Sequence, residues 1–306
     1  MVVVCGEALV DMIYGADGAQ HPAPGGGPFN TARALARMGV PTAFLGRLSN
    51  DAFGQRLAGL LVSDGATLEL ASIGSEPTTI AMAEVDSTGV ASYHFLVQGT
   101  SAPNLTPAMV PEQFGTQVKA LHVGTLGLVL EPMASTLVDL IIREHGRRVV
   151  MLDPNIRLGL VPDSQYRSHL TTAISNSAIV KASEADLAWL YPGLGYAEAA
   201  ERILGEGVRL VVATLGARGA FGAHGESRVH VAAPQVEVVD TIGAGDAFSA
   251  GLLAWLDEHA ALRPEVLLEP GQLEQALRLA CLVAALTCTR AGAEPPWKSE
   301  MPALGM

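Results

Sequence analysis

One stretch near the C-terminal end, Asp240–Gly251, constrains the fold and the chemistry of this chain more than any other. It reads Asp-Thr-Ile-Gly-Ala-Gly-Asp-Ala-Phe-Ser-Ala-Gly. Before it, Val236–Val239 alternates like a β-strand, and after it Ala247–Leu256 is apolar with a helical period. The sequence therefore predicts a tight glycine-rich turn between a strand and a helix, with the carboxylate of Asp246 in the first turn of that helix.

This turn indicates phosphoryl transfer. Backbone N–H groups at a helix N-terminus bind anions such as phosphate, so Gly243, Ala244 and Gly245 form a candidate anion hole. A carboxylate at the same place is out of keeping with a site that only binds phosphate. It is useful where it accepts a proton from a hydroxyl that attacks phosphorus, which makes Asp246 the candidate base. Because a helix N-terminus stabilises negative charge, we expect a lowered pKa for Asp246.

Composition excludes several classes of partner. The chain has 306 residues, is 49% hydrophobic and carries a net charge of −12, which argues against nucleic acid or an anionic membrane as partner. No apolar run approaches the roughly 20 residues of a membrane span, and no basic leader precedes the first strand. The three cysteines, Cys5, Cys281 and Cys288, lie in apolar segments without metal-ligand spacing. We interpret them as reduced thiols of a cytoplasmic protein.

Short apolar strands alternate with helical segments along most of the chain. This rhythm predicts one α/β domain over residues 1–306, built on a doubly wound, mostly parallel sheet with helices on both faces. Asn30 is expected to cap a helix over Thr31–Met38, and two further helices are expected within about Leu273–Leu286. The expected strands of the main sheet are Val2–Cys5, Pro41–Gly46, Ala120–Gly124, Arg148–Leu152, Ala178–Lys181 and Leu210–Thr214, followed by a late hairpin over Ala220–Ala223 and Ser227–Val231.

Two segments depart from that rhythm. Thr78–Phe95 predicts a β-hairpin around a turn at Ser87–Gly89, and Gly15–Gly27 reads as a loop or a ragged hairpin. We expect about 11–24 and 78–98 to form a small second sheet. Because such a sheet has free edges, a homodimer through it is a reasonable hypothesis.

Polar groups follow the predicted strands. In a doubly wound sheet the ligands bind at the carboxyl ends of the strands, so these groups should line one edge although they are distant in sequence. Two glycine-rich turns among them indicate one site for a nucleotide and one for a hydroxylated small molecule. The groups are Asp11, the Gly25–Asn30 loop, Asp153, Asn155, Arg157, Lys181, Glu184, the Thr214–Gly219 loop and Gly243–Asp246.

The chain resembles the ribokinase-like, or PfkB-type, carbohydrate kinases over almost its entire length. Asp240–Gly251 is close to one signature of that family, Gly25–Gly39 matches a second, and Gly46–Gly54 is a third match. Within the family, the segments most similar to bacterial fructokinases are Gly6–Asp11, Asp153–Arg157 and Ala291–Trp297.

The resemblance implies an ATP-dependent sugar kinase with Mg²⁺, whose second sheet acts as a lid. It implies Asp246 as base, Gly243, Ala244 and Gly245 as anion hole, and a sugar site made by Asp11, Gly26, Gly27, Asn30, Tyr93, Phe95, Arg157 and Asp246. It places the nucleotide at Thr214, Gly216, Gly219, Gly243, Gly245 and Cys281, and Glu184 at the acidic position of the family's N-x-x-E motif, where Lys181 replaces the Asn. A K⁺ site is implied at Asp240 and the carbonyls of Ile242, Thr287, Arg290 and Gly292.

Several acceptors remain open at this level. Fructose, phosphorylated at the 6-hydroxyl, is the leading candidate, and 2-keto-3-deoxygluconate is a rival whose carboxylate Arg157 would bind. Ribose or a nucleoside is a third possibility. A non-catalytic sensor of sugar or nucleotide is a different class, which the presence of Asp246, Glu184 and both glycine turns disfavours. A dinucleotide dehydrogenase is disfavoured because no G-x-G-x-x-G follows the first strand.

Overall fold

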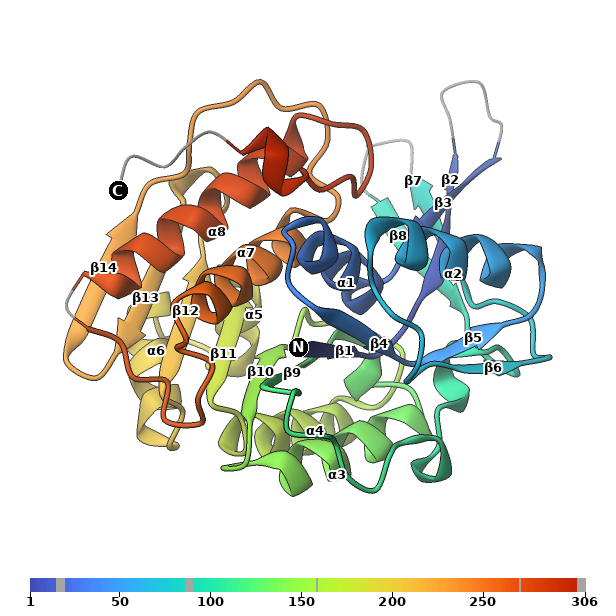
Figure 1. Cartoon of the computed structure of the whole chain (residues 1–306), viewed down its shortest axis with the longest axis horizontal. Helices are drawn as coiled ribbons and strands as arrows, with labels where there is room; N and C mark the ends of the chain where they lie inside the picture. The colour runs from blue at the N-terminus through green and yellow to red at the C-terminus, as the bar shows by residue number, and fades with distance from the viewer. Residues whose placement is uncertain (15–19, 86–90, 158, 270, 302–306) are drawn as a thin grey trace.

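The computed structural model describes residues 1–14, 20–85, 91–157, 159–269 and 271–301. Its centre is an eight-stranded sheet in the order β14-β13-β12-β11-β10-β9-β1-β4 (Figure 1). Six neighbouring strands are parallel, and the last two in sequence form an antiparallel hairpin at one edge. The strands are β1 (Val2–Cys5), β4 (Thr42–Leu45), β9 (Ala120–Gly124), β10 (Val149–Asp153), β11 (Ile179–Ser183), β12 (Leu210–Thr214), β13 (Ala220–His224) and β14 (Ser227–Val231).

Helices cover both faces of this sheet, which confirms the expected doubly wound α/β class. Side chains alternate along each strand, so Val2 and Val4 enter one apolar core while Val3 and Cys5 enter the other. The first core is covered by α1 (Gly27–Arg37), α2 (Ala52–Asp64), α7 (Ala244–Glu258) and α8 (Gln272–Cys288). The second is covered by α3 (Met133–Glu144), α4 (Asp163–Ser175), α5 (Glu184–Leu190) and α6 (Tyr196–Gly205).

A separate four-stranded sheet stands beside the β1–β4 edge of the main sheet (Figure 1). Its order is β3-β2-β7-β8, and the central pair β2–β7 is parallel while both outer pairs are antiparallel. The predicted turn at 87–89 lies outside the described residues. The strands are β2 (Leu9–Tyr14), β3 (Gln20–Gly25), β7 (Ile80–Val85) and β8 (Ala91–Leu96), and a third, two-stranded sheet consists of β5 (Arg47–Ser49) and β6 (Ser72–Gly74).

Short 3-10 helices complete the described secondary structure. Two of them matter for the site: η3 (Thr125–Leu128) follows β9, and η4 (Gly216–Arg218) follows β12 at the carboxyl edge of the sheet. The others are η1 (Ala102–Asn104), η2 (Pro107–Met109) and η5 (Lys298–Glu300). Within the described part of the chain, no helix combines the length and the apolar character needed to cross a bilayer.

Three local expectations were wrong. Val236–Val239 is not a strand, because its backbone pairs with the end of a helix: the amide of Val239 donates to the carbonyl of Cys288 at 2.8 Å. The region expected to hold two helices is one continuous helix, α8. Helix α1 begins at Gly27, so Asn30 lies inside its first turn and is not its cap.

A buried charge cluster attaches the C-terminal segment to α1. Arg33 and Arg37, one helical turn apart, both contact the carboxylate of Asp64 in α2, at 2.6 and 2.9 Å, and both also pair with Glu294. Arg33 additionally donates to the carbonyl of Ala293 at 3.2 Å. Since each charge has an opposite partner and further hydrogen bonds, the cluster fixes residues 293–295 against α1.

Candidate active site

The first turns of α1 and α7 meet, and the contact joins two residues expected to be functional. The side-chain amide of Asn30 donates to Oδ2 of Asp246 at 2.9 Å, and the hydroxyl of Thr31 lies 3.4 Å from the backbone carbonyl of Asp246. Both partners of the first contact are buried, with 7% of Asn30 and 8% of Asp246 exposed. The carboxylate is therefore held in one orientation by a neighbour from the other end of the sequence.

The turn before Asp246 leaves backbone donors unused. Gly243 caps α7 with a φ of 76°, a left-handed conformation that suits glycine, and a β-carbon there would lie 2.6 Å from Cβ of Ala293. Among the described residues, no hydrogen-bond acceptor is found for the backbone N–H of Gly245 or of Asp246. Free amides at a helix N-terminus can bind an anion, so the anion hole stays a prediction, although the amide of Ala244 already donates to the carbonyl of Thr241 at 3.2 Å.

The expected lowering of the Asp246 pKa was wrong. Burial raises the pKa of Asp246 to about 7, and the nearby charge of Asp153 acts in the same direction. The Asn30 hydrogen bond and the positive charges of Lys181 and Arg157 oppose that rise. Loss of hydration outweighs the helix terminus, so the group titrates close to neutral pH, which suits a general base.

A second buried acid, Glu7, was missed by the sequence reasoning. Its side chain is fully buried between β1 and η3, and its Oε2 accepts a 3.1 Å hydrogen bond from the backbone N–H of Gly127. Burial raises its pKa to about 8, and the charge of Asp246 adds to the effect. The available signal was an acid directly after a wholly apolar strand, where a charged side chain is rarely buried without a reason.

The predicted sugar ligands come from both sheets. Asp11 is the third residue of β2 in the small sheet, whereas the sequence reading placed it at the end of the first strand. Burial raises the pKa of Asp11 to about 6, and the charge of Arg157 opposes this. The guanidinium group of Arg157 donates to the carbonyls of Asn155 and Ile156, and its charge acts on both Asp11 and Asp246.

Close packing explains two of the predicted glycines. A β-carbon at Gly26, whose φ is 105°, would lie 2.8 Å from the carbonyl oxygen of Glu7. At Gly27 it would lie 2.5 Å from the hydroxyl oxygen of Thr125 and 3.2 Å from Oδ1 of Asp246. Thr125, which the sequence reasoning missed, thus reaches the same point as the candidate base.

The aromatic pair of the small sheet is described in part. Phe95 lies in β8, is partly buried and packs against the second apolar core. Tyr93 belongs to the same strand, but its side chain lies outside the described part of the molecule.

A cavity of about 340 Å³ lies beside the first turn of α7. Five predicted nucleotide-site residues line it together: Thr214, Gly216, Gly219, Gly245 and Cys281. Its other walls come from α8 and from residues 233–238. The end of that stretch belongs to the segment Val236–Val239, which the sequence reasoning had predicted as a strand. Its lining includes the apolar side chains of Cys281, Ala284 and Ala285 together with Gly216, Gly219 and Gly245, which suits a nucleotide.

Three predicted residues of the nucleotide site lie outside this cavity lining: Gly243, which caps α7, and Glu184 and Lys181. Glu184 begins α5, and its carboxylate pairs with Arg218 of η4 at 2.5 Å on the surface. Lys181 is buried beneath α7, and its ammonium contacts Asp153 Oδ2 at 2.6 Å.

The residues expected to bind a monovalent cation lie in two turns joined by Asp240. One oxygen of Asp240 accepts from the amide of Ile242 at 3.0 Å, and the other accepts from the amide of Gly292 at 2.8 Å. The carbonyl of Thr287 accepts from the amide of Arg290 at 3.1 Å. The described residues contain no group of three His, Cys, Asp or Glu side chains arranged to hold a metal, so any cation here would rely on carbonyl oxygens.

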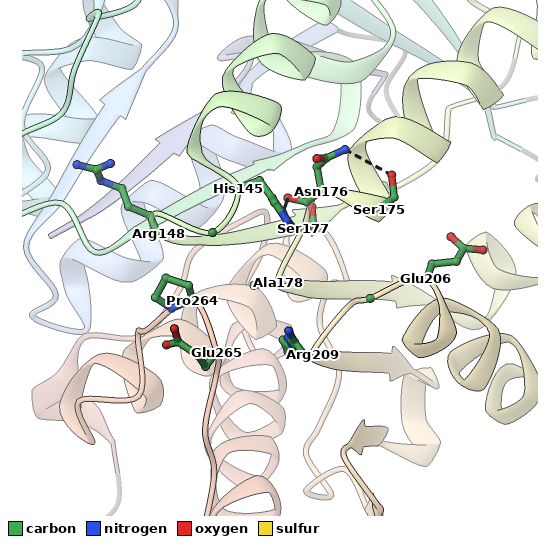
Figure 2. A pocket seen from close by; sticks show the side chains of 12 residues that line it. His145, Arg148, Ser175, Asn176, Ser177, Ala178, Glu206, Arg209, Pro264 and Glu265 are labelled. Carbon is green, nitrogen blue, oxygen red and sulfur yellow. Dashed lines mark hydrogen bonds between the residues drawn. The ribbon is translucent and has the colours of Figure 1, made fainter.

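A second cavity, of about 350 Å³, lies at the opposite end of the sheet (Figure 2). It is lined by residues that precede β10, β11 and β12, among them Arg148, Ser177 and Arg209. It is thus remote from Asp246, and the guanidinium of Arg148 points away from it toward Glu144 and the carbonyls of residues 114–118 (Figure 2).

Comparison with known proteins agrees with this geometry. Residues 1–300 match the family described as pfkB family carbohydrate kinase. A fructokinase of Rhizobium leguminosarum bv. trifolii is 38% identical over 288 residues, covering 91% of this chain and 86% of the relative. Among solved structures, Vibrio cholerae O395 fructokinase with bound fructose, ADP and calcium superposes with a TM-score of 0.83 at 29% identity, covering 95% and 94% of the two chains.

A second kind of kinase has the same fold. Aminoimidazole riboside kinase of Salmonella enterica, solved with aminoimidazole riboside and an ATP analogue, superposes with a TM-score of 0.82 at 25% identity, covering 95% and 94% of the chains. The fold is therefore shared by kinases with different acceptors. The chain belongs to the pfkB family of carbohydrate kinases, phosphotransferases that act on a sugar hydroxyl.

Proposed function

We propose that this protein transfers the γ-phosphoryl group of ATP to the 6-hydroxyl of fructose. The observation that carries the proposal is the buried Asp246, held by Asn30 beside free amides at the start of α7. The 38% identity to a fructokinase supports fructose as the acceptor.

The proposed mechanism uses three parts of the site. The sugar lies between the small sheet and α1, with Asp11, Gly26, Gly27, Asn30 and Arg157 as its hydroxyl ligands and Tyr93 and Phe95 as neighbours from β8. ATP lies in the 340 Å³ cavity with its γ-phosphate at the amides of Gly243, Ala244 and Gly245. Asp246 takes the proton of the attacking hydroxyl, and the amides stabilise charge on the transferring phosphoryl.

The protein offers few ligands for the two metal ions of the proposed mechanism, Mg²⁺ and K⁺. Mg²⁺ typically binds through ATP phosphates and one or two carboxylates, and Glu184, half-exposed at the start of α5, fits as a single such donor. When bound, Mg²⁺ supplies positive charge to the triphosphate. The two turns joined by Asp240 offer the carbonyls of Ile242, Thr287, Arg290 and Gly292, which fit K⁺ as an activator.

We further propose one domain over residues 1–306, a cytoplasmic location and a homodimer through the small sheet. The three cysteines are free, as expected in a reducing compartment. Strands β3 and β8 are the edges of the small sheet, and Leu96 of β8 is 51% exposed, so a second copy would cover an apolar edge. Light scattering tests this, and a monomer at assay concentration would remove the dimer.

The acceptor is tested with an ATP-coupled assay over fructose, ribose, 2-keto-3-deoxygluconate and adenosine. We expect fructose to give the highest kcat/KM. Preference for 2-keto-3-deoxygluconate would redirect the proposal to an acid acceptor bound by Arg157, the cation near Asp11 and Asp246. Turnover of none of the four would favour a sensor and contradict the proposed function.

A further inference from the structure

A buried ion pair lies directly beneath the first turn of α7. Asp153 is the last residue of β10, Lys181 is the third residue of β11, and their side chains meet at 2.6 Å with 3% and 4% of each residue exposed. The hydroxyl of Ser249 in α7 lies 3.3 Å from Asp153 Oδ2 and 3.2 Å from the carbonyl of Gly245. The pair is therefore connected to the turn that precedes Asp246.

The positive end of this pair faces Gly245. A β-carbon at Gly245 would lie 3.2 Å from Nζ of Lys181, and no other atom of another segment would lie within 4 Å of it. The carboxylate of Asp153 is farther from that point than the ammonium group is. In a water-excluded site, a dipole in this orientation strengthens the positive potential at the amides of Gly245 and Asp246.

Stability alone does not account for the pair. Replacing a buried ion pair by apolar side chains of similar volume is often neutral or stabilising. Oδ1 of Asp153 has no hydrogen-bond partner among the described residues, and the same holds for both ring nitrogens of His122, which is 2% exposed on the neighbouring strand β9. Buried polar atoms without hydrogen-bond partners lower the stability of the fold, so this cluster points to a role in the chemistry at the first turn of α7.

Lys181 keeps its charge in this environment. Burial opposes the charged form, but the carboxylates of Asp153, Asp246 and Asp186 outweigh it, so the pKa of Lys181 is raised above its usual value. His122 is neutral by contrast, because burial, assisted by the charge of Lys181, lowers its pKa to about 3. Lys181 is thus the one ammonium group among the side chains described around this turn.

We propose that Lys181, fixed by Asp153, is a positioning residue for phosphoryl transfer that acts through Gly245. It supports the first turn of α7 from below and places positive charge behind the amides that receive the transferring phosphoryl group. This inference rests on the proposed function. It assigns Lys181 to the transition state, and not to direct contact with the bound nucleotide.

The test is the charge-free double variant Lys181→Met/Asp153→Leu, compared with Lys119→Met. Lys119 pairs with Asp257 at the other end of α7, at 3.0 Å on the surface, which makes it a matched control. We expect the double variant to lose about 10²- to 10³-fold in kcat, the range of an anion-hole donor, with little change in the KM for fructose or the Kd for ADP. Lys119→Met should keep the wild-type kcat.

Binding of ADP with aluminium fluoride, Mg²⁺ and fructose separates this role from a structural one. The double variant should lose affinity for that transition-state mimic by the same factor as kcat while it binds ADP normally. Unchanged kcat and unchanged affinity for the mimic would overturn the inference, although the wild type still phosphorylated fructose. Absence of turnover in the wild type would instead contradict the proposed function.

A measurement on the unmodified protein decides the matter if the double variant does not fold. The chain has only three lysines, and Lys119 and Lys298 have side chains 49% and 62% exposed, so the ¹⁵N resonance of the buried Lys181 ammonium is distinguishable. We expect it to shift on addition of ADP with aluminium fluoride, Mg²⁺ and fructose well beyond its shift with ADP alone. Equal shifts in the two complexes would overturn the inference.

Discussion

Asn30 and Asp246, which are 216 positions apart in the sequence, share a buried 2.9 Å hydrogen bond from the amide of one to the carboxylate of the other. The donor comes from the first turn of α1 and the acceptor from the first turn of α7. Two helix N-termini from the two ends of the chain thus meet at one carboxylate. That contact links the residue expected to hold the acceptor to the residue expected to take its proton.

Asp246→Asn should abolish most of the turnover without abolishing binding. An amide of the same shape accepts no proton, and loss of a general base costs about 10²- to 10⁴-fold in kcat. Calorimetric titration should show fructose and ATP still bound, because the amides of the α7 turn do not depend on the charge. A variant with near wild-type kcat would remove Asp246 as the base.

Activity should depend on pH through the same group. Since burial raises the pKa of Asp246 to about 7, the ionised base is lost below that pH, and kcat/KM for fructose should rise from pH 5, reach half of its plateau near pH 7 and level off about one pH unit above that. In Asn30→Ala the hydrogen bond that favours the charged form of Asp246 is absent, so the acidic side of the pH profile should move to higher pH. If the acidic side of the profile stays at the same pH in Asn30→Ala, the assignment of the pH dependence to Asp246 would be contradicted.

The free energy of unfolding should fall as pH rises toward 8. Glu7 has a folded pKa of about 8 against an ordinary value near 4.5, so between these values the folded state binds the extra proton and loses stability as pH rises. The slope from one such group is at most about 1.4 kcal/mol per pH unit. Urea unfolding at several pH values should show a shallower decline for Glu7→Gln, which carries no titrating proton. Equal slopes for the two proteins would contradict a protonated Glu7.

Filling the nucleotide cavity should raise the KM for ATP selectively. Ala285 lies on the wall that α8 contributes to this cavity and is 8% exposed. Ala285→Leu therefore places three extra carbons in the space assigned to the adenine ring of ATP. Overpacking of this kind costs about 1–3 kcal/mol, or roughly a 5- to 150-fold rise in the KM for ATP, with the KM for fructose unchanged. Gln275→Leu, at an exposed position of the same helix, is the control and should leave both constants unaltered. A rise in both constants in Ala285→Leu would argue for general damage to the fold.

Asp64→Asn should destabilise the protein strongly. It removes the carboxylate shared by the buried Arg33 and Arg37, and breaking a buried pair costs about 3–5 kcal/mol because charge is left without a partner. Glu274→Gln, which breaks the surface pair with Arg278 on α8, should change the free energy of unfolding by less than about 1 kcal/mol. Urea denaturation measures both, and similar losses in the two variants would show that the Arg33–Arg37 cluster is not the stabilising feature.

The sequence predicted those parts of the molecule that depend on local pattern. Apolar strands, their helices and the glycine turn before Asp246 follow from periodicity and from the conformations that glycine permits. The prediction of a strand over Val236–Val239 failed because alternation is necessary for a strand but not sufficient: none of the described strands pairs with it, and α8 supplies the acceptor for its backbone. Tertiary context decided its structure.

Electrostatic properties were beyond the sequence for a different reason. The pKa of Asp246 depends on how completely the fold removes water from it, and also on the hydrogen bond from Asn30 and the charges of Asp153 and Lys181, which three other elements bring to it. The sequence reading included the helix terminus and omitted the burial, so it had the wrong sign. Glu7 and Thr125 were missed likewise, since only the fold brings them to this edge. Lys181 and Asp153 were expected at this edge, but the ion pair between them was not.

The parallel pairing of β2 with β7 has a consequence for the choice of acceptor. Because β2 pairs with both β3 and β7, the two hairpins form one continuous small sheet. Residues 6–8 connect its strand β2 to β1 of the main sheet. Asp11 belongs to that small sheet, whereas Asn30 and Asp246 belong to helices packed on the main sheet. The angle between the two sheets therefore sets the distance from Asp11 to Asp246. In the proposed kinase, that distance would select a sugar by its length as well as by the positions of its hydroxyl groups.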